Sequence, residues 1–138
     1  MNFFNLFSEY PNKIGFEDIK SVISNNNKLT IIINTLPFDD QSCLIKSTIL
    51  CNNEEKIINE FMKKNDYKTN IIIYGKNASD NSVYNKYNQL KSIGFSNIYI
   101  YSGGLFEWLL LQDIYGFSEF PTTKQKVDIL KYRELPVF

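Results

Sequence analysis

The residues best suited to chemistry form a polar loop between an apolar run and a helical pattern. The apolar run, residues 70–74, is rich in isoleucine, and the helical pattern continues to Gly94. The loop consists of Gly75, Lys76, Asn77, Ala78, Ser79, Asp80, Asn81 and Ser82. Backbone N–H groups at the start of a helix can bind an anion, to which Lys76 would add positive charge and the serines hydroxyl groups. The loop therefore predicts a site for a small anion or small molecule.

The same loop also fits a second interpretation, an ordinary solvated connection. Asn, Asp and Ser are common turn formers, and either Ser82 or Asn81 would be a good cap for the helix that follows. Asp80 opposes anion binding because its carboxylate carries the same charge as the ligand. The sequence leaves both interpretations open.

The chain has two cysteines, Cys43 and Cys51, and no histidine. The missing histidine excludes catalytic triads and metal sites that depend on an imidazole. Cys43 lies on the connection after a predicted strand and Cys51 directly follows another, so we expect both to be small packed side chains. Two cysteines are too few for a disulfide scaffold, and we therefore expect free thiols in a reducing compartment.

Adjacent carboxylates occur at Asp39 and Asp40, on the loop that follows the predicted strand at residues 29–34. Carboxylate oxygens bind hard cations, but a metal site needs further ligands that the sequence does not place nearby. We expect no metal and no cofactor.

The 75–82 loop must be positioned by a βαβ unit over residues 70–104. Two short β-branched and aromatic runs flank an amphipathic helix, a pattern that predicts parallel strands joined by a right-handed crossover. Upstream, residues 29–34 form a nearly continuous β-branched run, which is typical of a strand buried on both faces. Further helical patterns cover residues 16–24, 54–64 and 105–115.

The second half of the chain resembles the rhodanese domain family. The resemblance rests on a helix ending in Ile93-Gly94-Phe95, a strand Asn97-Ile98-Tyr99-Ile100, and Ser102-Gly103-Gly104 followed by Trp108. It covers about residues 13–115 and implies a three-layer α/β/α fold. The implied sheet is five-stranded, mainly parallel and ordered 3-2-4-5-1, with strands near Lys13, Thr30, Ser47, Ile71 and Ile98. In this order the 75–82 loop lies at the switch point of the sheet, where ligands bind in such folds.

The resemblance also locates the family's catalytic residue. In rhodaneses the strand before the loop runs into a catalytic cysteine, and an arginine usually stands near the end of the loop. Here the cysteine position falls between Gly75 and Asn77, and residues 75–82 contain neither cysteine nor arginine. The resemblance therefore implies a module that is inactive as a thiosulfate sulfurtransferase and binds a protein or a small anion.

Two alternatives remain. A divergent sulfurtransferase would use Cys43, because sulfur transfer requires a thiolate. A structural protein would form homo-oligomers, or bind a partner, through the apolar helix from Leu105 to Tyr115 and the tail. We expect a single domain over residues 1–138, in which residues 117–138 form an ordered C-terminal extension because they carry many apolar side chains.

Composition excludes several classes of function. Fifteen basic and fifteen acidic residues give a formal net charge of zero, which argues against binding to nucleic acid or an anionic membrane through overall charge. No apolar run reaches transmembrane length, and the amino terminus lacks the basic region of a signal peptide. We expect a cytoplasmic location.

Overall fold

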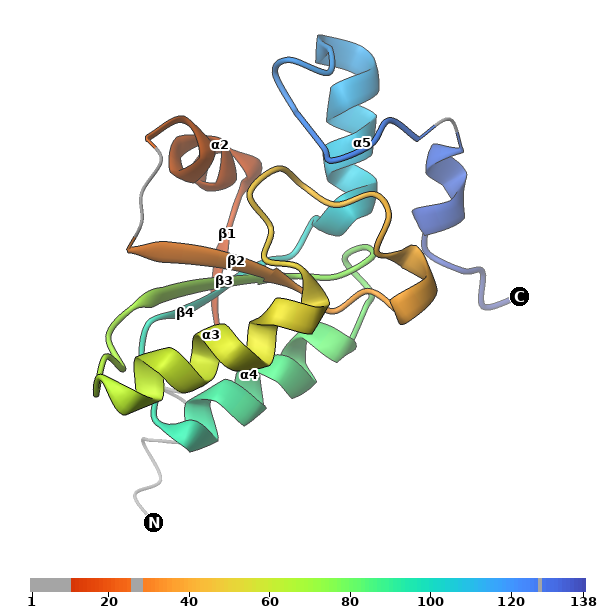
Figure 1. Ribbon diagram of the computed structural model, residues 1–138. Helices are drawn as coiled ribbons and strands as arrows, with labels where there is room; N and C mark the ends of the chain where they lie inside the picture. Colours follow the sequence, from red (N-terminus) through yellow and green to blue (C-terminus); the bar gives the residue numbers. More distant parts are fainter. Residues whose placement is uncertain (1–10, 26–28, 127) are drawn as a thin grey trace.

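The computed structural model of the protein describes residues 11–25, 29–126 and 128–138. The elements in chain order are β1 (Asn12–Ile14), α2 (Phe16–Asn25), β2 (Thr30–Asn34), the 3-10 helix η1 (Phe38–Asp40), α3 (Cys51–Lys63), β3 (Asn70–Tyr74), α4 (Ser82–Ile93), β4 (Ile98–Tyr101), α5 (Gly104–Tyr115) and the 3-10 helix η2 (Ile129–Tyr132). They form three layers, with a sheet between two pairs of helices (Figure 1).

The sheet has four strands in the order β1-β4-β3-β2, and all of its pairings are parallel. Helices α3 and α4 cover one face, and α2 and α5 cover the other (Figure 1). Alternate residues of β3 supply the two cores: Ile71 and Ile73 pack toward α3 and α4, whereas Ile72 and Tyr74 pack toward α2 and α5. Burial on both faces explains the unbroken β-branched runs. The predicted α/β/α architecture and parallel sheet are confirmed.

The predicted strand near Ser47 is wrong. Only a single bridge joins this segment to the sheet, between Ile32 and Thr48, at the edge where the strand was expected. Ser47 has a φ of 74°, a left-handed conformation that interrupts an extended chain. The four remaining strands keep the predicted spatial order.

The segment before Ser47 pairs with the C-terminal part of the chain instead of with the sheet. The Lys46 amide donates to the Pro121 carbonyl over 3.1 Å, and the Thr123 amide donates to the Leu44 carbonyl over 2.8 Å. These bonds form an antiparallel contact around an Ile45 to Thr122 bridge. The chain at residues 44–46 thus runs beside residues 121–123, and the left-handed Ser47 separates this pairing from the Thr48 bridge to the sheet.

The extension after α5 packs partly on the body of the domain. Trp108 donates from Nε1 to the Pro121 carbonyl over 3.1 Å, and Gln112 donates from Nε2 to the Phe120 carbonyl over 2.7 Å. Phe120 and Tyr132 are buried in the core shared by α2 and α5. The final apolar residues are exposed: Leu135, Val137 and Phe138. The apolar excess of the tail is therefore only partly buried within this chain.

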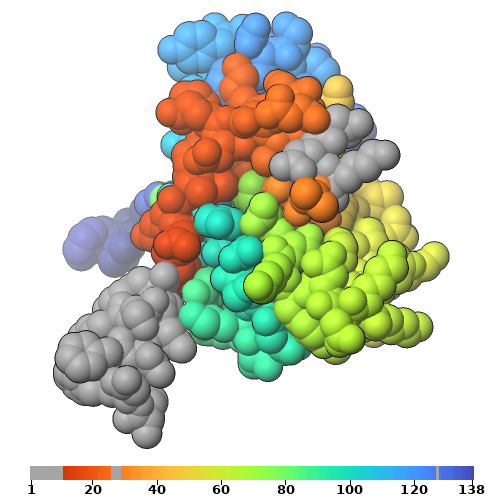
Figure 2. Space-filling model, turned by 90° about the vertical axis from the view of Figure 1, so that its left-hand side faces the viewer, coloured from red at the N-terminus to blue at the C-terminus, as the bar shows by residue number. Residues whose placement is uncertain are grey.

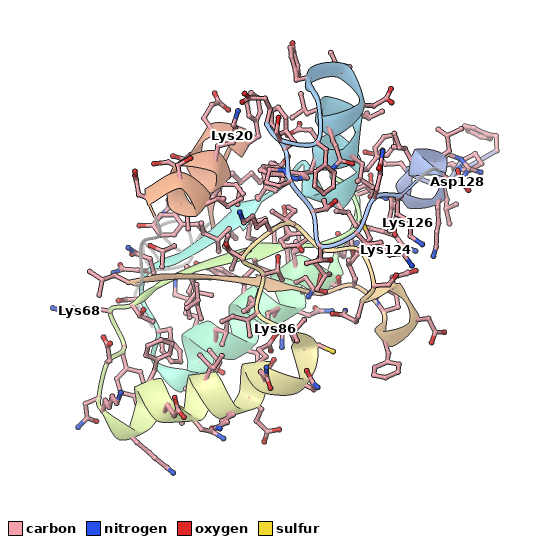
Figure 3. All side chains as sticks on the ribbon, turned by 45° about the horizontal axis from the view of Figure 1, so that its top comes forward. Lys20, Lys68, Lys86, Lys124, Lys126 and Asp128 are labelled. Carbon is pink, nitrogen blue, oxygen red and sulfur yellow. The ribbon has the colours of Figure 1, made fainter. Side chains whose placement is uncertain are left out.

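The molecule has two well separated ends. The extension carries Lys124, Lys126 and Asp128 at the end opposite Lys68, which precedes β3 (Figure 3). The C-terminal end of α5 projects above α2 (Figure 2, light blue at the top). Among the described residues, no helix combines the length and the apolar character needed to cross a membrane.

Two buried tyrosine hydroxyls predict opposite responses to mutation. The Tyr74 hydroxyl accepts from the Ile45 amide over 3.1 Å and contacts Thr48 Oγ1 at 2.8 Å. The Tyr132 hydroxyl is buried and has no hydrogen-bond partner among the described residues. We expect Tyr74→Phe to lower the free energy of unfolding by about 1–3 kcal/mol, and Tyr132→Phe to leave it unchanged or raise it. Urea denaturation of both variants measures this, and equal losses would contradict the assignment.

Candidate functional site

The 75–82 loop lies at the carboxyl edge of the sheet, where the start of α5 holds its backbone. The Leu105 and Phe106 amides, at the start of α5, donate to the carbonyls of Gly75 and Lys76, each over 2.9 Å. Gly104, with a φ of 69°, permits this approach, because a Cβ there would lie 2.8 Å from the Gly75 carbonyl oxygen. The start of α5 therefore comes close to the loop backbone at Gly104.

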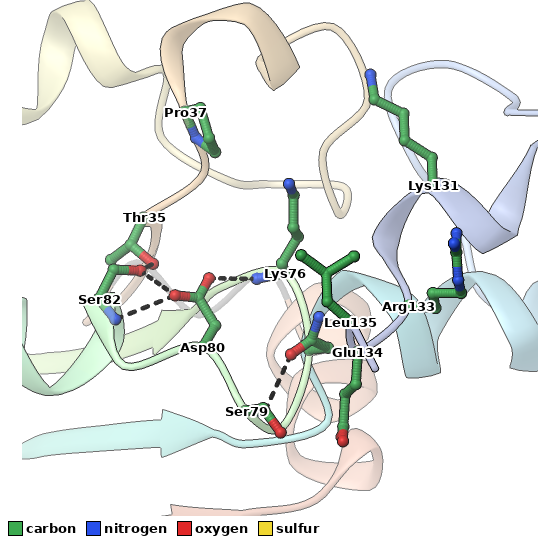
Figure 4. A pocket seen from close by; sticks show the side chains of 11 residues that line it. Thr35, Pro37, Lys76, Ser79, Asp80, Ser82, Lys131, Arg133, Glu134 and Leu135 are labelled. Carbon is green, nitrogen blue, oxygen red and sulfur yellow. Dashed lines mark hydrogen bonds between the residues drawn. The ribbon is translucent and has the colours of Figure 1, made fainter. Parts of the chain in front are cut away.

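The centre of the loop is the carboxylate of Asp80 (Figure 4). Its Oδ2 accepts a hydrogen bond from the Lys76 amide over 2.8 Å. Its Oδ1 accepts from the Ser82 amide over 3.0 Å and from the Ser82 hydroxyl over 2.6 Å. Amides that open α4 and would face a bound anion therefore face a carboxylate of the chain itself. Asp80 accepts from the first amide of α4 and so caps this helix. The prediction that Asn81 or Ser82 caps it through its own side chain is wrong.

Burial tends to raise the pKa of the Asp80 carboxyl, but the surrounding donors outweigh it. The hydrogen bonds from the Lys76 and Ser82 amides and the Ser82 hydroxyl, together with the Lys76 charge, hold the pKa below its ordinary value. The loop thus favours the ionised form of the Asp80 carboxyl.

Gly75 is the position from which a side chain would enter this arrangement. A Cβ at Gly75 would lie 2.5 Å from Asp80 Oδ2 and 3.0 Å from Thr35 Oγ1. The hydroxyl of Thr35, which follows β2, lies within hydrogen-bond distance of Ser82 Oγ, at 2.7 Å, and so is also fixed. The space beside Gly75 is therefore filled by the Asp80 carboxylate.

Asn77 links the loop to the C-terminal extension. Its Oδ1 accepts from the Ser79 amide over 3.0 Å, and its Nδ2 donates to the Tyr132 carbonyl over 2.9 Å. Because Tyr132 is completely buried, the extension is anchored directly beside the loop.

A second link is ionic and centres on Asp40 in η1, which is buried. Lys131 Nζ lies 2.7 Å from one carboxylate oxygen of Asp40, and Lys76 Nζ lies 3.8 Å from the other. The hydrogen bond to Asp40 raises the pKa of Lys131. Asp40 is thus the counter-ion of two lysines, and no group of three or more potential metal ligands occurs among the described residues.

Together these segments enclose a cleft of about 450 Å³, which we term the loop cleft (Figure 4). Its lining comes from the 75–82 loop, the turn after β2 and the C-terminal extension. The lining residues are Thr35, Pro37, Lys76, Asn77, Ser79, Asp80, Ser82, Lys131, Arg133, Glu134 and Leu135. Five of the predicted loop residues line it, whereas Gly75, Ala78 and Asn81 do not.

Residues from outside the loop were missed by sequence reasoning. The apolar tail indicated packing, but nothing in its pattern placed Lys131 or Arg133 beside the loop. Asp40 was considered only as a metal ligand, whereas it holds two lysines.

Neither cysteine is among the residues that line the loop cleft. Cys43 is completely buried, and its Sγ donates to the Lys124 carbonyl over 3.1 Å. Burial raises the pKa of the Cys43 thiol, and a hydrogen bond with Thr122 and nearby lysines only partly offset this effect. Cys51 is exposed at the first residue of α3, so the prediction that it is packed is wrong. The strand expected before it does not form, and its side chain points away from the core.

The chain matches the sequence model of the rhodanese-like domain over residues 25–111. A crystal structure of the Alr3790 protein from Anabaena sp. has a TM-score of 0.59 at 20% identity, covering 86% of this chain and 97% of that one. A Lactobacillus plantarum protein gives 0.57 at 17% identity, covering 78% and 87% of the two chains. Thiosulfate sulfurtransferase from Pseudomonas aeruginosa gives 0.55 at 17% identity, covering 72% of this chain and 19% of that one. No curated protein sequence matches the chain.

The packing at Gly75 predicts a destabilised Gly75→Ala variant. The added methyl group meets an Asp80 carboxylate that three hydrogen bonds hold in place, so we expect a loss of about 1–3 kcal/mol in the free energy of unfolding. Gly15→Ala is the matched control, since its Cβ would contact only the side chain of Glu17. In an Asp80→Ala background the cost of Gly75→Ala should shrink, and strict additivity in this double-mutant cycle would argue against the contact.

The lowered pKa of Asp80 predicts an acid-dependent loss of stability. A depressed pKa in the folded state stabilises the protein above the ordinary value of 3.8, and this contribution is lost as the pH falls through the lower folded value. We therefore expect Asp80→Asn to be less stable than wild type at neutral pH, with the difference narrowing below pH 3.8. Urea denaturation at a series of pH values measures this, and a constant difference would contradict it.

Proposed function

The chain belongs to the rhodanese-like domain family, and we propose that it is a non-catalytic member that binds a protein partner at the loop cleft. The observation that carries this proposal is the Asp80 carboxylate, which accepts from the Lys76 and Ser82 amides beside Gly75. In rhodaneses a reactive cysteine opens this loop. Here the Asp80 carboxylate fills the space beside Gly75, one of the positions to which that cysteine could correspond, and a carboxylate cannot carry a persulfide.

The same carboxylate disfavours a small anion as the ligand of the loop. The Lys76 and Ser82 amides donate to Asp80, and the Ser79 amide donates to Asn77. An anion that used these three amides would have to displace these bonds and approach a negative charge. Of the two ligand classes that the family resemblance suggests for an inactive domain, a protein therefore fits better.

A sulfurtransferase that uses Cys43 is the less favoured alternative. A nucleophilic thiol needs access to its substrate and a lowered pKa. Cys43 has no exposed surface, and burial raises its pKa. These properties support a packing role.

A homo-oligomeric protein remains a further candidate, supported by the exposed end of α5. Ile114 is 68% exposed and Tyr115 63%, at the part of α5 that projects in Figure 2. Light scattering at high protein concentration tests this candidate, and a monomer would remove it.

The proposal predicts no transfer of sulfur from thiosulfate to cyanide. We expect the wild-type protein, Cys43→Ser and Cys51→Ser to match the blank in this assay, with thiosulfate sulfurtransferase as the positive control. Mass spectrometry of thiosulfate-treated protein should detect no persulfide. Turnover that disappears with Cys43→Ser or Cys51→Ser would overturn the non-catalytic proposal and identify the nucleophile.

A further inference from the structure

The proposed function does not specify the chemistry of the partner. The charges of the loop cleft indicate which kind of protein segment would fit it. We infer that the loop cleft binds an acidic segment of a partner protein, with acidic side chains of that segment pairing with Lys76 and with Arg133. This inference rests on the proposed function, because it assumes that a protein occupies the cleft.

The first argument is an unbalanced cluster of charges. Asp40 is the only acid within 4.0 Å of Lys76 Nζ or Lys131 Nζ among the described residues. Its contact with Lys131 is a short hydrogen-bonded pair, whereas 3.8 Å to Lys76 is too long for a hydrogen bond. Two ammonium groups thus share one carboxylate. The Lys76 side chain, which is 34% exposed, keeps its donors for another acceptor.

Arg133 adds further unpaired donors. Its Nη1 donates to the Leu130 carbonyl over 2.9 Å, and no ion pair joins Arg133 to an acid of the described chain. A guanidinium group has five N–H donors, so most of them remain for a ligand. Planar guanidinium groups favour carboxylates because two hydrogen bonds form at once.

Among the described residues, the two acids that line the cleft, Asp80 and Glu134, form no ion pair with its cations. Both oxygens of Asp80 are turned toward donors of its own loop. The Glu134 carboxylate lies across the cleft from the Lys76 and Lys131 ammonium groups (Figure 4). The cleft therefore presents positive charge at one side, and complementarity calls for a carboxylate there.

Exposed apolar residues favour a polypeptide over a small carboxylate. Pro37 and Leu135 line the cleft, and Leu135 is 80% exposed. A protein segment can place acidic residues against Lys76 and Arg133 and apolar neighbours on Pro37 and Leu135, as is common at protein interfaces.

The test is selection of a random dodecapeptide display library on the full-length protein. We expect the recovered peptides to be enriched in Asp and Glu and to contain large apolar residues. One recovered peptide, made synthetically, should bind the Lys76→Gln/Arg133→Gln variant at least about tenfold more weakly than wild type. Its affinity should be unchanged by Lys68→Gln, a matched control at the opposite end of the molecule (Figure 3).

Each other outcome contradicts the inference in a distinct way. Recovered peptides without an acidic excess, but weakened by Lys76→Gln/Arg133→Gln, would overturn the acidic chemistry and leave the proposed protein-binding cleft standing. Peptides unaffected by that variant but lost with Ile114→Ser would overturn both and favour the surface of α5. Recovery of no peptide would overturn the acidic-segment inference, and the sulfurtransferase assay would still decide separately whether the domain is catalytic. Far-ultraviolet circular dichroism verifies that each variant is folded.

Discussion

The structure of the candidate site depends on one interaction, the capping of the 75–82 loop by the carboxylate of Asp80. A strand-to-helix loop at the edge of a parallel sheet leaves amide donors without backbone partners, and these must be satisfied by a ligand, by water or by a side chain. In this protein Asp80 satisfies the Lys76 and Ser82 amides at once. These two amides therefore need no bound anion. The same carboxylate requires glycine at position 75, because any side chain there would meet it.

The second constraint is the attachment of the C-terminal extension, most of which lies beyond the part of the chain that matches the family, residues 25–111. The extension pairs with residues 44–46, buries Tyr132 and holds Asn77 and Asp40 through polar contacts. In doing so it builds one wall of the loop cleft. The loop is thereby bordered by a segment that brings its own charges.

The sequence predicted the architecture well because burial on both faces leaves a strong pattern. The isoleucines of β2 and β3, the helical spacing of Val83, Tyr87 and Leu90, and the stop at Gly94 all reflect local physics and are found as expected. The predicted strand near Ser47 failed because long-range pairing with residues 121–123 and the left-handed Ser47 backbone compete with the sheet. Neither effect is visible in local periodicity.

The site was predicted only in part, and for a related reason. The loop could be located, because its position follows from the βαβ unit. The role of Asp80 could not be decided from the sequence, because an aspartate there can be either a turn former or a charge that repels an anion. The folded loop brings its two oxygens to the Lys76 and Ser82 amides. The positions of Lys131 and Arg133 beside the loop could not be predicted, because the docking of an irregular tail leaves no periodic pattern in the sequence.

The most direct test of the account follows the backbone amide resonances of Lys76 and Ser82 by nuclear magnetic resonance as the pH is lowered. If Asp80 accepts from both amides, their proton shifts should move together with a single midpoint below 3.8, because protonation of one carboxyl weakens both hydrogen bonds. At neutral pH, added thiosulfate should leave both resonances in place. Independent midpoints would show that Asp80 does not accept from both amides. A saturable shift of both amides with thiosulfate would show that the loop is an open anion site. Either result would contradict the central claim.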